Sequence, residues 1–161
     1  MNYLALLNGV IITDLIVIVM LVFGIIESKS LKEWYNNFSL GGFMSDIFSI
    51  MFGIMLAHFI YPYIFSKFKL VNFIILTVAI QLIHDISFGM LLNKIPEGSS
   101  KIIDTFKHYV SEHGMKILAV DSTMIISTIL ISTYLSDKSN DVNALILVTS
   151  LYILPYFLYS I

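Results

Sequence analysis

The chain is dominated by five apolar stretches, each about as long as a helix that crosses a lipid bilayer. They cover approximately residues 3–26, 41–65, 70–92, 115–135 and 142–161. A helical crossing needs about 20 apolar residues, and in lipid only helices or closed barrels satisfy all backbone polar groups. We therefore predict an all-α integral membrane protein, with a bundle of about five transmembrane helices forming a single membrane domain over residues 1–161.

Composition supports the lipid bilayer as the surroundings of this chain. Hydrophobic residues make up 58% of it and charged residues only 12%, whereas soluble domains are about one quarter charged. The first stretch carries Asp14 and is not preceded by a basic segment. These features indicate a first span rather than a removable signal peptide.

The connections after the first and third stretches are long and hold most of the charge. Residues 100–113 begin with a capping serine and end before Gly114. The apolar residues of this segment fall on one helical face: Ile102, Ile103, Phe106, Tyr109 and Val110. This pattern predicts a short interfacial amphipathic helix that lies in the membrane surface.

In the first long connection, Trp34 and Tyr35 lie in a charged stretch, as interfacial anchors do.

The charged residues exclude several classes of function. All nine basic residues are lysine, so the chain has no arginine cluster for phosphate and we expect no nucleic acid partner. It has no cysteine, which excludes thiol redox chemistry and thiolate metal sites. Most of the lysines lie on the long connections, so the positive-inside rule places these connections in the cytoplasm and the N-terminus outside.

Four of the five predicted spans contain an aspartate, although a charged side chain at the bilayer centre costs about 2.5–3.5 kcal/mol. They are Asp14, Asp46, Asp85 and Asp121, and His84 precedes Asp85. Counting along alternating helix directions puts all of them in the membrane half nearest the 100–113 helix. His58 falls in the other half.

Helical spacing indicates which way some of these side chains point. Thr77, Gln81, His84 and Asp85 form one polar stripe, and Asp121, Thr128 and Ser132 form another. Asp46 belongs to a stripe of small residues from Gly42 to Ala57. Because small residues let helices pack closely, we expect Asp46 to point into the bundle.

Three uses fit such a cluster. The first is a channel or transporter for protons or small cations, with a pathway formed by Asp14, Asp46, Gln81, His84, Asp85 and Asp121. The second is a non-catalytic scaffold or virion membrane protein, able to form a homo-oligomer, in which the aspartates bond to neighbouring helices. The third is a divalent-metal-dependent enzyme acting on lipid, with a divalent cation held by ligands from the set Asp46, His84, Asp85 and Asp121.

Motifs of known machinery do not narrow this choice. The chain has no potassium-channel filter, no arginine-rich voltage sensor, no zinc-protease motif, no hydrolase nucleophile motif and no P-loop. The absence of enzyme motifs favours a non-catalytic function.

Four strings resemble small polytopic membrane proteins of large DNA viruses that infect algae and protists. They are LKEWYNNFSLGG, SDIFSIMFGIMLAHFIYPYIF, QLIHDISFGMLL and LYILPYFLYSI, within a composition rich in Ile, Asn, Lys, Phe and Tyr. The resemblance implies a protein of a viral inner membrane or of a remodelled host membrane. Since those proteins are uncharacterised, it assigns no role to any residue.

Overall fold

A computed structural model describes all 161 residues and contains seven helices and no strand. The helices are α1 (Tyr3–Val22), α2 (Lys29–Phe38), α3 (Leu40–Ile64), α4 (Leu70–Leu92), α5 (Lys101–His113), α6 (Lys116–Ser136) and α7 (Asn140–Leu158). Five of them, α1, α3, α4, α6 and α7, are long and apolar enough to cross a membrane. The predicted class, an all-α multi-pass membrane protein with five spans, is therefore confirmed.

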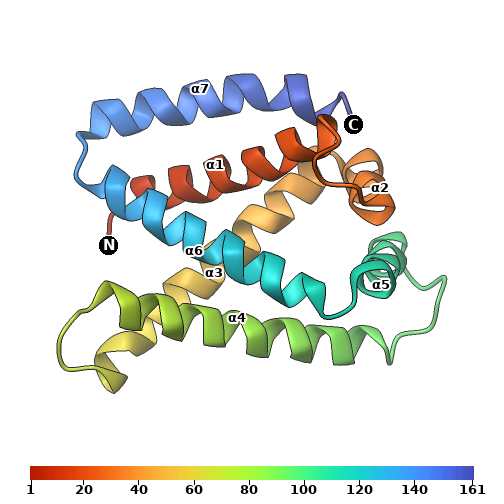
Figure 1. Cartoon of the computed structure of the whole chain (residues 1–161), viewed down its shortest axis with the longest axis horizontal. Coiled ribbons are helices and arrows are strands. Elements are labelled where there is room, and N and C mark those ends of the chain that lie inside the picture. Colours follow the sequence, from red (N-terminus) through yellow and green to blue (C-terminus); the bar gives the residue numbers. More distant parts are fainter.

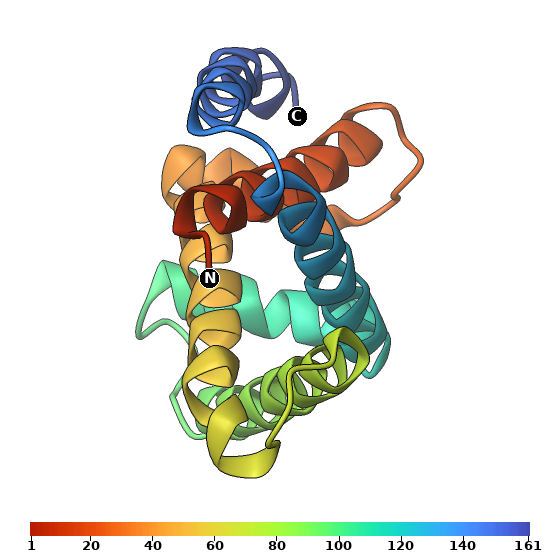
Figure 2. The same cartoon turned by 90° about the vertical axis from the view of Figure 1, so that its left-hand side faces the viewer.

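Four of the spans form a closed ring, and the fifth lies outside it. Helix α1 contacts α3 and α6, and α4 contacts the same two helices from the other side. Figure 2 shows this ring, with α7 lying beyond α1. Because α1 is covered on both sides, 56% of the residues in its most apolar stretch are buried, against 11% for α4. The remaining apolar surface faces outward, as expected for spans in lipid.

Polar and small residues fix how α1 packs against its neighbours. The Asn8 amide donates to the backbone oxygen of Asn143 on α7 at 2.9 Å and to its side-chain oxygen at 3.1 Å. The Thr128 hydroxyl on α6 donates to that of Thr13 at 3.1 Å. At Gly9, a Cβ atom would lie 2.9 Å from the backbone oxygen of Thr128. A glycine is therefore required for α1 and α6 to approach this closely.

The two short helices lie across one end of the ring. Figure 1 looks nearly along α2 and α5, whereas α1, α4, α6 and α7 run across the view. Helix α5 matches the predicted 100–113 segment in position and is amphipathic. Part of its apolar face contacts protein rather than the membrane surface, because Phe106 packs against Trp34 at 4.7 Å and against Phe88 at 5.6 Å between ring centroids.

Helix α2 was not predicted as a helix. It begins after Ser28, whose hydroxyl accepts the Leu31 amide at 3.1 Å, and it ends at Ser39, which has a φ of 46° and lets the chain turn into α3. Its apolar side packs against α3 and α5. The segment expected to be an interfacial anchor is therefore a helix. Its residues Trp34 and Tyr35 are buried.

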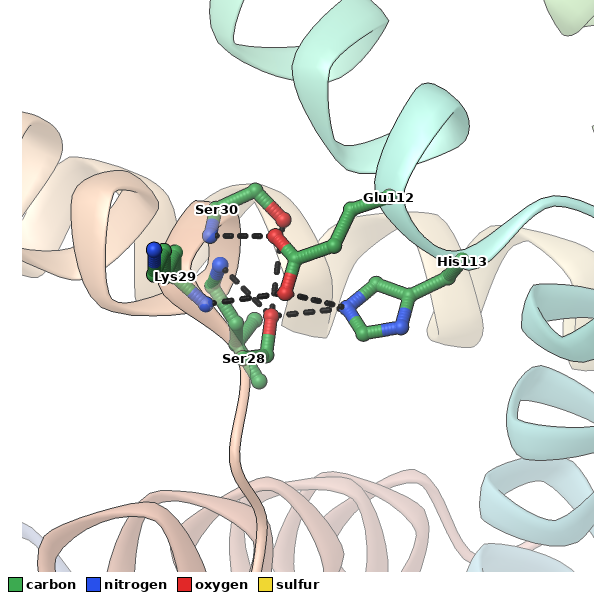
Figure 3. Close-up of polar contacts among 6 residues, drawn as sticks. Ser28, Lys29, Ser30, Glu112 and His113 are labelled. Atoms are coloured by element: carbon green, nitrogen blue, oxygen red, sulfur yellow. Dashed lines mark hydrogen bonds and ion pairs between the residues drawn. The ribbon is translucent and has the colours of Figure 1, made fainter.

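A polar contact joins the start of α2 to the end of α5, as shown in Figure 3. The Glu112 carboxylate accepts the backbone amides of Lys29 at 2.9 Å and Ser30 at 2.7 Å. Next to it, His113 Nε2 lies 2.7 Å from the Ser28 hydroxyl. Hydrogen bonds from the Ser30 hydroxyl and from these amides lower the pKa of Glu112 to about 2. The two short helices are therefore held together by a charged cap on the α2 N-terminus.

Candidate functional site

The ring encloses a cavity of about 390 Å³ beneath α2 and α5. Each helix of the ring contributes one aspartate to its lining: Asp14 from α1, Asp46 from α3, Asp85 from α4 and Asp121 from α6. Gln81 also lines it. Five of the six residues of the predicted pathway thus surround a single space, in the membrane half that the helix directions indicated.

Tyr35 connects two of these carboxylates. Its hydroxyl lies 3.3 Å from Asp14 Oδ1 and 3.3 Å from Asp46 Oδ2. Since a phenol has one hydrogen, it donates to one carboxylate at a time. Burial and the nearby Asp14 and Asp46 carboxylates raise the pKa of Tyr35 well above its usual value. The hydroxyl therefore remains a proton-bearing donor at neutral pH.

Trp34 supplies a second donor to Asp46. The indole Nε1 lies 3.1 Å from Asp46 Oδ2. A Cβ atom on Gly42 would lie only 2.9 Å from the same nitrogen, so a glycine is needed there for the indole to reach the carboxylate. Two residues of α2, which does not span the membrane, thus supply the donors to the aspartates of α1 and α3.

On the other side of the cavity, Asp85 is held within its own helix. Gln81 Nε2 donates to Asp85 Oδ1 at 2.7 Å. The Asp121 carboxyl group of α6 lies near that of Asp85. Two carboxylates at this approach repel each other unless a proton or a cation lies between them.

Tyr109 of α5 lies above these carboxylates and lines the same cavity. Burial, followed by the charges of Asp121 and Asp46, raises its pKa well above the usual value. Its hydroxyl therefore stays neutral and places a potential donor at the α5 side of the cavity.

His84 does not line the cavity. Its side chain is 48% exposed, stacks on Phe88 with 5.8 Å between ring centroids, and places Nδ1 3.0 Å from Asp85 Oδ1. Consecutive residues of a helix point about 100° apart, and here Asp85 faces the cavity while His84 points away from it. His58 is exposed too and does not line the cavity.

Two buried carboxylate oxygens have no partner. Asp14 is fully buried, and its Oδ2 atom accepts no hydrogen bond; the same is true of Asp85 Oδ2. The three close acid–base pairs of the chain all involve histidine. Lys116 lines the cavity but forms no ion pair with any carboxylate. The protein itself therefore does not neutralise most of the acidic charge that it places here.

The four candidate metal ligands, Asp46, His84, Asp85 and Asp121, do not meet as one set. No three His, Asp or Glu side chains of the chain are placed to hold a single metal ion. Structural and catalytic zinc sites use at least three protein ligands. The cavity therefore holds no complete ligand set of the zinc type.

Sequence reasoning missed the cavity residues of the connections, Trp34, Tyr35 and Tyr109. One signal was available: Leu31, Trp34, Tyr35 and Phe38 recur at the three- and four-residue spacing of a helix face. The helical spacing of residues 100–113 places Tyr109 on the apolar face of that helix, which was expected to contact lipid. In the structure Tyr109 instead lines the cavity.

Comparison of the chain with protein-family models, curated proteins and solved structures finds no match. A fold can host unrelated functions, so function is argued from a site in any case. The cavity and its four aspartates are the features of this chain that bear on its function.

Proposed function

We propose that the chain binds protons or small cations in this cavity and carries them across the membrane as a channel or transporter. The observation that supports the proposal most directly is the ring of four aspartates around one space, with Asp14 Oδ2 buried and without a partner. Intramembrane acids that face a bundle interior typically mark ion or proton pathways. A bound cation or proton would supply the missing partner.

The partners of the aspartates argue against a role in pairing helices. The donors that reach them come from α2 or from their own helix: Tyr35, Trp34, Gln81 and His84. No donor from another spanning helix bonds to any of the four. Other contacts connect the spans, such as those of Asn8 with α7 and Thr13 with α6. The hydrogen bonds of the aspartates therefore do not pair one spanning helix with another.

The cavity does not continue through the other half of the bundle. One or two turns below the aspartates, the interior is filled by Val10, Ile54 and Ile129, each at most 3% exposed. A space that is closed at one end by packed side chains fits alternating access better than an open pore. We therefore favour a transporter over a channel.

Flux into proteoliposomes tests the proposal. The purified chain would be reconstituted with an internal pH dye or a potassium- or sodium-sensitive dye, and an ion gradient applied. We expect flux for the unmodified chain, and a loss of at least about tenfold for Asp85→Asn combined with Asp121→Asn. The matched control is Asp137→Asn, since Asp137 is exposed at the far end of α6 and its loss should leave flux unchanged.

The folded yield of each variant separates transport from a structural role. Flux is therefore expressed per folded protein, measured by size-exclusion chromatography and circular dichroism. If the double variant loses folded protein but keeps its flux per folded molecule, Asp85 and Asp121 have a structural role and the proposed pathway through them is wrong. Absence of flux of every cation tested from the unmodified chain would also contradict the transport proposal.

The proposed orientation has the α2 and α5 end in the cytoplasm, by the lysine count. The chain has no cysteine, so single introduced cysteines report topology without background. We expect Ser99→Cys, between α4 and α5, to resist a membrane-impermeant maleimide in intact cells, and Ser66→Cys, between α3 and α4, to react. The reverse labelling pattern would show that the orientation is wrong.

A further inference from the structure

The size of the cavity suggests a cargo larger than a bare inorganic ion. Its volume, about 390 Å³, lies in the range of about 300–1,000 Å³ typical of small-molecule sites. A dehydrated metal ion would need several oxygen ligands close together, and no group of three acidic or histidine side chains provides them. A cargo of several heavy atoms would instead fill the space.

Most of the cavity wall is apolar, although its acidic groups are concentrated. Of the 27 lining residues, 15 are hydrophobic, so much of any ligand surface would lie against hydrocarbon. A strongly hydrated ion gains nothing from such a wall and loses its water there. A ligand with an apolar body would bury that body favourably, at about 25 cal/mol per Å².

Aromatic rings form the side of the cavity nearest α2 and α5. Trp34, Phe88 and Phe106 pack together, with Trp34 and Phe106 tilted by 55° and Phe88 edge-on to Phe106. Tyr35 and Tyr109 complete this side. Faces of Trp, Tyr and Phe attract organic cations, most strongly where water is excluded.

The carboxylates determine that a ligand of this cavity must carry a positive charge. Asp14 and Asp85 each present a buried oxygen without a partner, and no lysine neutralises either of them. The cavity therefore combines two features. Its unpartnered carboxylate oxygens favour a cation, and its aromatic and aliphatic wall favours an apolar group.

From this combination we propose that the cavity binds an organic ammonium cation with an apolar body. Its positive nitrogen lies between the aspartates and the aromatic rings, and its hydrocarbon part lies against the apolar wall. This inference rests on the proposed cation transport and names the class of cargo.

Trp34 provides the readout, because it is the only tryptophan of the chain and lines the cavity. The protein in lipid nanodiscs would be titrated with benzyltrimethylammonium, and the fluorescence of Trp34 followed. We expect a saturable change. Neopentylbenzene, which has the same shape without the charge, and tetramethylammonium, which has the charge without the ring, should each bind at least about tenfold more weakly.

Three variants locate the site. Asp14→Asn keeps the shape of the side chain and removes its charge, and should weaken binding by roughly tenfold or more. Phe106→Leu keeps an apolar group and removes the ring, and should weaken binding by about three- to tenfold. Asp137→Asn, outside the cavity, should bind as the unmodified chain does. Circular dichroism confirms that each variant is folded.

The outcomes separate this inference from the proposed function. Aspartate-dependent flux of protons, sodium or potassium without saturable benzyltrimethylammonium binding would overturn the inference and leave the transport proposal standing. Benzyltrimethylammonium binding that Asp14→Asn leaves unchanged would also overturn it. The third outcome is aspartate-dependent binding of benzyltrimethylammonium without flux of it or of any of these ions. This result would support the ligand class and refute the transport proposal.

Discussion

Replacing Gly9 with alanine should separate the two helices that close the ring. A Cβ atom at this position would lie 2.1 Å from the Ser132 hydroxyl, 2.9 Å from the Thr128 backbone oxygen and 3.1 Å from the Ser132 backbone nitrogen. The hydroxyl can rotate away, but the other two atoms belong to the backbone of α6. To relieve the overlap with these backbone atoms, α1 and α6 must move apart by a few tenths of an ångström.

The expected cost follows from this overlap. Extra atoms forced into a packed interior destabilise by about 1–3 kcal/mol. Alanine forms helices better than glycine in water, but a span in lipid remains helical when the bundle comes apart, so little of that gain offsets the cost. We expect Gly9→Ala to lower the free energy of unfolding by about 1–3 kcal/mol.

The control is Gly41→Ala, because a Cβ atom there meets nothing within 4 Å. The stability of this variant should differ from that of the unmodified chain by less than about 0.5 kcal/mol. Unfolding would be followed in mixed micelles with increasing sodium dodecyl sulfate, by the fluorescence of Trp34, which is 5% exposed in the folded chain. Equal midpoints for the two variants would refute the close packing of α1 on α6.

Three further predictions use the same unfolding assay. Tyr35→Phe removes the hydroxyl donor of Asp14 and should cost about 1–3 kcal/mol; no change would show that the bond is absent. Because the pKa of Glu112 is lowered to about 2 from its usual 4.5, its carboxylate stabilises the fold above about pH 4.5, and this stabilisation disappears as the pH falls toward 2. Glu112→Gln should therefore destabilise at pH 7 and much less at pH 3, and an equal effect at both would contradict the linkage. Asn143→Ala loses its side-chain bond with Asn8 of α1 and those to three backbone oxygens, and should cost about 1–3 kcal/mol and speed proteolysis of α7.

The spans could be predicted from the sequence because hydropathy and length are local properties. Residues 70–92 agree fully with α4, and 41–65 differs from α3 by one residue at each end. The first span ends four residues earlier than predicted, at Val22, and the chain then turns at Gly24 with a φ of 71°. Apolar residues continue beyond that turn, so hydropathy alone does not mark the end of the helix.

The ring itself could not be predicted, because hydropathy does not say which spans touch. Side-chain direction could be predicted wherever a helix carried a polar stripe. Thr77, Gln81 and Asp85 face the interior as their spacing indicates, and His84, adjacent to Asp85, points away. Asp14 has no polar neighbours one turn away, so its direction became clear only from its partner on α2.

The contribution of α2 shows why a non-spanning segment matters for this site. Its Trp34 and Tyr35 supply the donors to Asp46 and Asp14, and its N-terminus is capped by Glu112 of α5. Any movement of α2 away from the ring must therefore break the bonds of two aspartates on different spans. The polar contacts within the bundle do not involve α2, so these carboxylates can lose their donors while the ring stays intact. The segment that covers the cavity thus also supplies the hydrogen-bond donors to two of the groups that give the cavity its charge.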